Sequence, residues 1–300
     1  MINTKLPFEI IICDDCSSDN SIEYIKNNFP EIKLICNEVN QGYSPTINKG
    51  IIKASYDYVF LLNNDVSVSE DYFIPQLRYF EREDTFGVMG RIIGWNNDEI
   101  QDGAKYPYFH GVKIKTNGNY VLQQPKREDW LYSVYLSGAN AFVDRKKLLL
   151  LNGFDETFAP FYVEDYELSI RAWRLGWKCY YEHFSVCRHM TSVTIKKKSS
   201  KKFIKRIYNR NKMFLHAIHL SKRHFTIWNI QLFFELLYNA LTGKTYYIKS
   251  FMDYRKSINL VKKSKERLIE NSQKTGTLLP TETVFTLIKN SLNELSIKKF

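Results

Sequence analysis

Acidic side chains follow two of the strands that this sequence predicts. Asp14 and Asp15 come directly after an apolar, β-branched segment, and Asn63, Asn64 and Asp65 come after another. Because ligands of a parallel α/β sheet bind at the carboxyl ends of its strands, we expect these side chains at one edge of the sheet.

Three further residues belong to the same predicted edge. Glu164 and Asp165 open a predicted helix between the last two strands, and His189 follows the final strand. Carboxylate oxygens with an imidazole suit Mn²⁺ or Mg²⁺, so the pattern predicts a divalent metal beside a diphosphate. These acids can instead have a purely structural role, because acidic side chains also stabilise turns and the first turn of a helix. His189 is equally compatible with an ordinary surface position.

Strands alternate with helices in the first half of the chain. Strands are predicted at 8–13, 32–36, 58–62 and 86–93, and helices at 18–28, 43–54 and 71–81. Continuous apolar strands of this kind indicate an α/β fold with a mainly parallel sheet and helices on both faces. Residues 94–130 predict loops with one hairpin, followed by a strand at 134–144, a helix at 164–175 and a strand at 177–184.

The second half is helical and locally basic. The net charge is +11, yet residues 183–234 alone hold 12 Lys/Arg and no Asp or Glu. Helices are predicted at 201–220, 228–241, 246–270 and 282–295, so we divide the chain into an α/β domain at 1–195 and a basic helical region at 196–300.

The helix at 201–220 has apolar residues on one face and lysines and arginines on the other. Its apolar face can pack on the α/β domain, or the segment 196–223 can lie on an anionic membrane surface. We favour the membrane.

Composition excludes several classes of protein. No apolar stretch is as long as the about 18 residues that a membrane span needs. The first residues of the sequence do not have the pattern of a signal peptide. The five cysteines form no paired framework, which indicates reduced thiols and a cytoplasmic location. The positive charge is confined to one block without a nucleic-acid motif, so we expect no nucleic-acid partner.

Several short motifs occur in a fixed order along the chain. They are Asp14–Ser21, Asn40–Tyr43, Asn48–Gly50, Leu61–Asp65, Ser137–Asn140, Gly153–Glu156, Glu164–Arg171 and His189. In this order they resemble the bacterial family 2 glycosyltransferases of GT-A fold, including rhamnosyl- and galactofuranosyltransferases. Each motif alone is weak, and the signal lies in their order on the predicted elements.

The resemblance implies an inverting, metal-dependent transferase. It would move a sugar from a nucleoside-diphosphate sugar to a hydroxyl of a glycan or lipid-linked acceptor, in cell-surface polysaccharide synthesis at the inner face of the plasma membrane. Asp165 would be the general base, with Glu164 beside it. Asp65 and His189 would bind the metal, and Asn63 stands where relatives have Asp.

The same resemblance implies two binding sets. Asp14 would contact the base and Asp15 the ribose. The other donor-binding residues would be Asn40, Gly42, Asn48, Asn64 and Asp65. The acceptor-binding residues would be Gly138, Asn140, Asp155 and Glu164.

Compared with the family, the first strand and helix are missing, since only seven residues precede the segment 8–13. In the family's sheet that strand lies between the strands predicted here at 8–13 and 58–62. These two strands then pair directly, another segment fills the gap, or the natural protein starts upstream, which we favour. The alternatives to an active enzyme are a non-catalytic relative that binds sugar nucleotide or glycan, and a basic nucleic-acid-binding protein.

Overall fold

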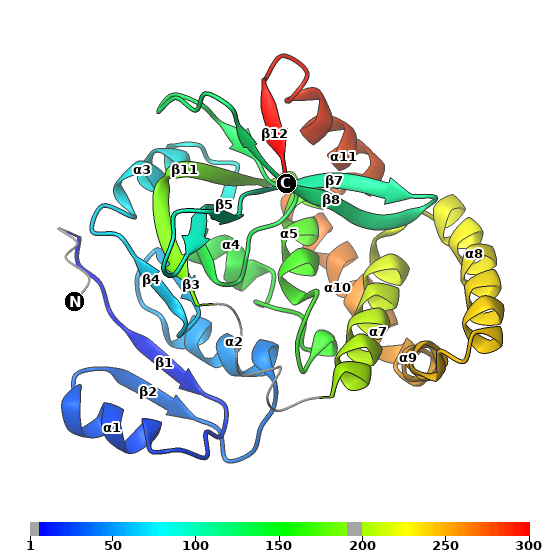
Figure 1. Cartoon of the computed structure of the whole chain (residues 1–300), viewed down its shortest axis with the longest axis horizontal. Coiled ribbons are helices and arrows are strands. Elements are labelled where there is room, and N and C mark those ends of the chain that lie inside the picture. Colours follow the sequence, from blue (N-terminus) through cyan, green and yellow to red (C-terminus); the bar gives the residue numbers. More distant parts are fainter. Residues whose placement is uncertain (1–5, 191–199) are drawn as a thin grey trace.

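The computed structural model describes residues 6–190 and 200–300 and has an α/β fold, as predicted (Figure 1). The strands are β1 (Ile11–Asp14), β2 (Lys33–Cys36), β3 (Tyr58–Leu62), β4 (Val66–Val68), β5 (Thr85–Gly94), β6 (Ile100–Asp102), β7 (Ala104–His110), β8 (Lys113–Leu122), β9 (Leu131–Tyr132), β10 (Asn140–Asp144), β11 (Lys178–His189) and β12 (Ile297–Lys299). The helices are α1 (Ser21–Asn28), α2 (Tyr43–Lys53), α3 (Ile74–Leu77), η1 (Arg78–Glu81), α4 (Arg145–Leu150), η2 (Glu156–Phe158), α5 (Glu164–Arg174), α7 (Lys201–His219), α8 (Lys222–Leu241), α9 (Thr245–Lys256), α10 (Ile258–Thr275) and α11 (Thr281–Asn290).

The central sheet has the strand order β3-β10-β5-β11-β4, with β6 added to β5 and β9 added to β11. β5 and β11 pair in parallel, whereas β10 runs antiparallel between β3 and β5. Strands β3, β5 and β11 therefore share one direction within a mixed sheet. Their carboxyl ends lie at the same edge, where the polar residues were expected.

The first two strands form a sheet of their own. β1 pairs in parallel with β2, and in the described part of the chain neither of them pairs with β3 (Figure 1). Direct pairing of β1 with β3 is thus not the arrangement that the structure adopts. Helix α2 makes the connection instead, because it packs on β1 and also contacts α4 and η2.

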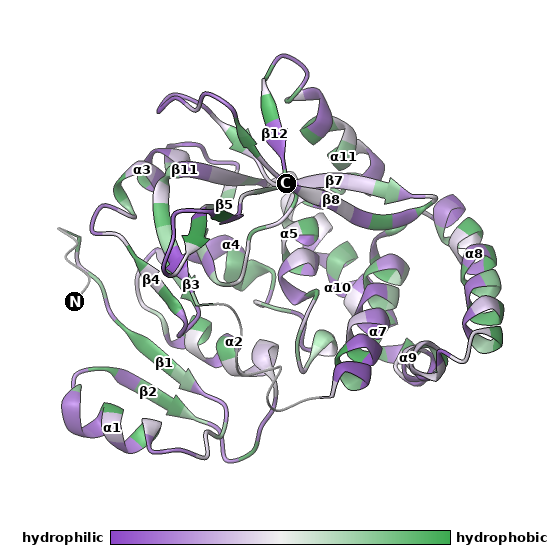
Figure 2. Cartoon of the chain, in the orientation of Figure 1, coloured by the Kyte–Doolittle hydropathy of each residue, from purple (hydrophilic) through white to green (hydrophobic). Residues whose placement is uncertain are grey.

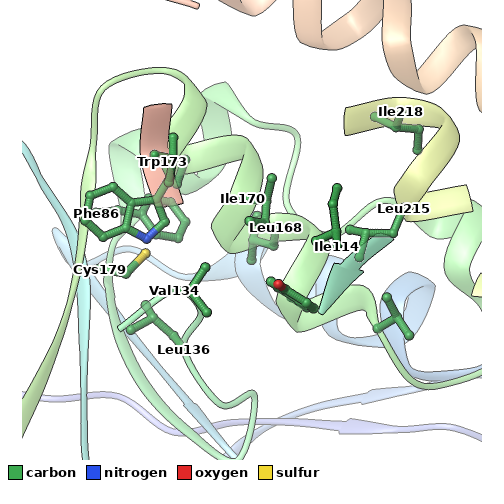
Figure 3. Packing of buried hydrophobic residues seen from close by; sticks show 14 of the residues in the cluster. Phe86, Ile114, Val134, Leu136, Leu168, Ile170, Trp173, Cys179, Leu215 and Ile218 are labelled. Carbon is green, nitrogen blue, oxygen red and sulfur yellow. The ribbon is translucent and has the colours of Figure 1, made fainter. Parts of the chain in front are cut away.

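The hydrophobic core is continuous from the sheet to the C-terminal helices. Figure 3 shows Trp173, Phe86 and Cys179 packed together, with Leu215 and Ile218 of α7 in the same cluster. The C-terminal strand β12 also pairs with β8, so the end of the chain contributes to a sheet begun before residue 195. The proposed boundary at 195 itself lies outside the described residues.

Helix α7 uses its apolar face for internal packing. Ile207, Met213, Phe214 and Ile218 are buried, and the helix contacts α5, α9 and α10. Of the two interpretations of this amphipathic helix, packing on the α/β domain is the one the structure adopts. Its apolar face is therefore not available to lipid, which corrects the favoured interpretation for that face. Residues 196–199 of the predicted membrane segment lie outside the described residues.

Several element boundaries differ from the prediction. The helix expected at 246–270 is two helices, α9 and α10, that meet at Ser257. Only the end of the strand predicted at 134–144 is in β10, because the preceding residues form the turn that carries Gly138. The short elements α4 and β4 were not predicted, since neither is long enough to show a periodic apolar pattern.

Candidate functional site

Asp65 and His189 lie side by side, as the sequence suggested. β4 pairs antiparallel with β11, and this register puts Val66 opposite His189. The Met190 N–H donates to the Asp65 carbonyl at 2.9 Å, which fixes the two chain segments together. As a result His189 Nε2 lies 3.5 Å from Asp65 Oδ1. That carboxylate oxygen is buried and has no hydrogen-bond donor.

This pair fits a divalent cation whose coordination shell is completed by oxygen atoms of a substrate. Among residues 6–190 and 200–300 no group of three or more His, Cys, Asp or Glu could enclose a metal by itself. Mg²⁺, however, is usually held by one or two carboxylates together with substrate phosphates and waters. The unpaired Asp65 oxygen beside an imidazole suits such a role. Asn63 shapes the same turn through its backbone, because its carbonyl accepts the Val66 N–H at 3.2 Å.

Glu164 and Asp165 lie together at the start of α5. Asp165 Oδ1 accepts the Tyr166 N–H at 2.7 Å, whereas Glu164 Oε2 is buried without a partner. Burial raises the pKa of Asp165, although the backbone N–H groups of Tyr166 and Gly138 act against that rise. Burial and the Asp165 charge together raise the pKa of Glu164 to about 8. At neutral pH this site therefore holds Glu164 protonated, next to an Asp165 carboxyl whose pKa lies above its ordinary value.

The segment before these acids has an unusual backbone. Tyr162 and Val163 have φ angles of 73° and 76°, in the left-handed region. A β-branched residue rarely adopts this conformation, which costs on the order of 1–3 kcal/mol per residue. The surrounding structure must therefore hold the segment in place.

Helix α7 supplies that support. Asn211 is fully buried, and its Nδ2 donates to the carbonyls of Phe158 at 2.6 Å and Tyr162 at 2.8 Å. The Arg210 guanidinium donates to the Ala159 carbonyl of the same segment. Sequence reasoning missed Asn211, although one signal was present. It is a polar residue at helical spacing within the apolar series of Ile207, Phe214 and Ile218.

The turn of Gly138 and Ala139 lies between the acid pair, Glu164 and Asp165, and the pair of Asp65 and His189. The Asn63 N–H donates to the Ala139 carbonyl at 3.3 Å, and the Tyr43 hydroxyl donates to the Gly138 carbonyl, also at 3.3 Å. A Cβ at Gly138 would lie 3.2 Å from Tyr43 Oη and 3.8 Å from Asp165 Cβ. The absence of a side chain at residue 138 thus leaves room for the Tyr43 hydroxyl, and the turn lies within van der Waals reach of Asp165.

Two lysines interact electrostatically with Asp165, although burial reduces their own positive charge. Burial lowers the pKa of Lys105 to about 7, with the Asp165 charge acting in the opposite direction. Burial, helped by Lys115 and Lys113, lowers the pKa of Lys212 to about 7. Lys212 Nζ lies 4.8 Å from the centre of the Tyr166 ring. Neither lysine was predicted, because they come from a segment read as loops and from the basic face of α7.

Asp15 binds the backbone of the residues that precede α2. Its carboxylate accepts the N–H groups of Gln41 and Gly42, each at 2.8 Å, and the Asn37 amide at 2.9 Å. Partial burial opposes ionisation, but the Gln41 N–H and these other donors hold the pKa of Asp15 below its ordinary value. Gly42 has φ 89°, and a Cβ there would lie 2.5 Å from the Pro160 Cα.

The neighbouring polar residues also hold the backbone. Asp14 accepts the Ser17 N–H at 2.9 Å, and Asn40 Nδ2 donates to the Asp15 carbonyl at 3.1 Å. These contacts show that Asp14 and Asn40 stabilise turns, which was the structural interpretation left open for the acids in the sequence. Their contact with a nucleotide stays a prediction.

Asn48, Asp155 and Asn140 all have protein partners. Asn48 exchanges two hydrogen bonds of 2.9 Å with the backbone of Phe154. Asp155 accepts Arg267 Nη2 at 2.9 Å and begins η2. Asn140 is fully buried in β10, where it offers no exposed atom to an acceptor. These side chains therefore position the site's backbone, and any direct ligand contact by them is untested.

Comparison with known families identifies the first half of the chain. Residues 2–149 match the model of the family described as glycosyl transferase family 2. The poly-beta-1,6-N-acetyl-D-glucosamine synthase of Staphylococcus epidermidis is 37% identical over 84 residues, which are 27% of this chain and 20% of that protein. The N-acetylglucosaminyl-diphospho-decaprenol L-rhamnosyltransferase of Mycobacterium tuberculosis is 23% identical over 205 residues, 59% of this chain and 65% of that one. The match thus spans a fifth of the first relative and just under two thirds of the second.

Solved structures show the same fold. GalNAc-T7, in a crystal structure with UDP, GalNAc and Mn²⁺, superposes with a TM-score of 0.57 and 19% identity over 71% of this chain and 42% of that one. Residues 1–349 of Staphylococcus aureus TarS, in complex with UDP-GlcNAc, give a TM-score of 0.51 and 12% identity over 97% of this chain and 86% of that one. At these identities the likeness concerns the fold alone, and it agrees with the GT-A architecture expected from the motifs.

The contacts of Asn211 predict a local effect of its removal. Asn211→Ala leaves the carbonyls of the segment 158–162 without their donor, and each lost bond costs on the order of 1 kcal/mol. We expect faster amide hydrogen exchange at 158–165 and a lower melting temperature. Asn209→Ala is the matched control, because Asn209 bonds only to its own helix, through the Lys205 carbonyl. Equal exchange in both variants would show that α7 does not hold this segment.

Proposed function

The chain belongs to glycosyl transferase family 2 through residues 2–149, and from this membership we propose that it is an inverting, metal-dependent glycosyltransferase. Its donor is a nucleoside-diphosphate sugar. Its acceptor is a hydroxyl of a glycan or lipid-linked saccharide in cell-surface polysaccharide synthesis. The activities for which the two relatives are named, those of a polysaccharide synthase and of a rhamnosyltransferase acting on a lipid-linked sugar, support this class of reaction.

One observation carries the proposal. The acid pair at the start of α5 and the Asp65–His189 pair are joined by a single turn, Gly138–Ala139. Transfer from a sugar nucleotide needs a base for the acceptor hydroxyl and a cation for the diphosphate that leaves. Residues suited to both tasks lie on either side of this turn, which supports the proposal.

Asp65 and His189 are the residues that would hold Mn²⁺ or Mg²⁺, with Asn63 next to them in the turn. A bound cation would offset the negative charge that develops on the leaving nucleoside diphosphate. Mn²⁺ is present with UDP in the GalNAc-T7 structure, which supports this choice of metal.

Asp165 is the proposed general base. Its carboxylate takes the proton of the acceptor hydroxyl while the oxygen attacks the anomeric carbon from the face opposite the leaving diphosphate, so the configuration inverts. Glu164 is protonated below about pH 8 and can therefore donate a hydrogen bond to a second acceptor hydroxyl. The low polarity that raises the pKa of both acids also strengthens these hydrogen bonds.

The remaining assignments belong to the same proposal. The donor-binding residues are Asp14, Asp15, Asn40, Gly42, Asn48, Asn64 and Asp65. Those on the acceptor side are Gly138, Asn140, Asp155 and Glu164. Asn48, Asn140 and Asp155 would act by positioning the backbone, because their polar atoms contact protein groups.

We also propose a cytoplasmic location with peripheral contact between the segment 196–223 and an anionic membrane, and no nucleic-acid partner. In the described part of this segment Lys201, Lys202 and Lys205 are exposed, which supports an electrostatic contact. Within residues 6–190 and 200–300 the structure has no helix whose length and apolar character would let it cross a membrane.

The assignment of Asp165 predicts a specific kinetic defect. Asp165→Asn cannot accept a proton, so turnover should fall at least about 100-fold while the donor dissociation constant stays close to that of the wild type. Sugar transfer and donor binding are measured separately. Asp84→Asn, at an exposed position, is the control. A mutant with wild-type turnover would remove Asp165 from the role of base.

The metal assignment predicts the behaviour of Asp65→Ala. A ligand that binds only the folded state raises the melting temperature, so wild-type protein should be stabilised by one nucleoside diphosphate in the presence of Mn²⁺. Asp65→Ala should lose this metal-dependent shift, whereas Asp71→Ala, at an exposed position, should keep it. If Asp65→Ala keeps the shift, the metal lies elsewhere. If cooperatively melting wild-type protein shows no shift with any nucleotide, the transferase proposal itself fails.

The raised pKa of Asp165 predicts the pH dependence of turnover. The base works only when ionised, so activity should be lost as the pH falls through this raised pKa. The Lys105 charge lowers the pKa of Asp165. In Lys105→Met the acidic limb of the turnover-versus-pH profile should therefore move to higher pH. Turnover at saturating donor is measured from about pH 5 to about pH 9. Lys146→Met, on the surface, is the control, and an unmoved limb in Lys105→Met would contradict the coupling.

A further inference from the structure

Helix α8 is apolar on two opposite faces. Its inner face buries Trp228 and Leu232. Its outer face has exposed fractions of 57% at Ile230, 62% at Phe234 and 88% at Leu241. By helical spacing the same face also carries Phe233, Leu237 and Tyr238, which are exposed. Figure 2 shows that α8 carries hydrophobic residues at the edge of the molecule. Two apolar faces on one helix are normally both covered, and in the described chain α8 is covered on only one of them.

The inner contacts fix which face points outward. The Trp228 ring centre lies 5.5 Å from that of His216 and 6.0 Å from that of Tyr254. Glu235 accepts the Tyr247 hydroxyl at 2.6 Å and pairs with Lys113 of the β7–β8 hairpin. Helix α8 is thus anchored at the edge of the molecule, and its outer face stays uncovered by the described chain (Figure 1).

The charges around this face are positive. Glu235 is the only acid in α8, and it points inward. Arg223 is exposed at the start of the helix, on the side of the apolar residues by helical spacing. Just after the end of the helix, Lys244 Nζ lies 4.9 Å from the centre of the Tyr238 ring. An apolar face with a cation at each end and no carboxylate is complementary to an anionic lipid surface.

We propose that the outer face of α8 docks the protein on an anionic lipid bilayer, with the helix lying in the plane of the interface. Phe233, Phe234 and Leu237 enter the boundary between headgroups and acyl chains, while Arg223 and Lys244 meet lipid phosphates. This contact extends the one proposed for the segment 196–223, with which it shares Arg223. It adds the exposed apolar residues of α8, whereas the apolar face of α7 is buried in the core. It does not depend on the proposed sugar transfer.

A vesicle-binding experiment on the full chain tests the proposal without an activity assay. The probes are vesicles of phosphatidylcholine alone and vesicles with about 30% phosphatidylglycerol, with cosedimentation as the readout. Wild-type protein should bind the anionic vesicles at least about tenfold more tightly, and 0.5 M NaCl should weaken this binding several-fold. Wild-type protein that stays in the supernatant with both kinds of vesicle would overturn the proposal.

The decisive variant is Phe233→Ser/Phe234→Ser/Leu237→Ser. It should lose at least about tenfold in affinity for the anionic vesicles and keep the wild-type melting temperature, because these side chains are exposed. The matched control is Leu260→Ser/Ile269→Ser on α10, whose side chains are 49% and 45% exposed. Equal loss in both variants would overturn the assignment to α8. So would a wild-type dimer in sedimentation that the triple variant dissociates, since the face would then cover a second copy of the chain.

Discussion

Two adjacent carboxyl groups, those of Glu164 and Asp165, are held largely away from water at the start of α5 by the segments packed around them. Burial raises the pKa of both. The Gly138 turn approaches from one side, while α7 holds the left-handed residues before the acids from the other. If either support were lost, water would reach the carboxyl groups and their pKa values would fall towards those of ordinary acids.

The sequence predicted the polar edge of the sheet because local rules determine it. Asp65 follows β3 and His189 is the last residue of β11, and strands of one direction end at one edge, so their proximity follows from the order of the elements. Asn211 and Lys105 could not be predicted in this way. They come from distant segments, and only the tertiary packing shows that Asn211 bonds the loop before α5 and that Lys105 lies near enough to Asp165 to interact with its charge.

In the C-terminal helices, an amphipathic pattern correctly predicts a helix but does not determine what covers its apolar face. Residues 201–220 do form an amphipathic helix, but periodicity does not say whether protein or lipid covers its apolar face. The buried Asn211 explains the outcome, because its amide needs the carbonyls of a folded loop and would be costly in lipid. Helix α8 lacks such a polar residue on its outer face, so nothing there requires a protein partner.

These two helices also link the proposed chemistry to the proposed docking surface. α7 bonds the loop before Asp165 and packs against α9, which in turn contacts α8. The inner face of α8 meets α7 directly, where Trp228 lies against His216. The docking face is therefore joined to the acid pair through packed helices rather than through a flexible linker. A protein held on a membrane by α8 would consequently present Asp165 to a lipid-linked acceptor in a defined orientation, because a rigid connection fixes both position and angle.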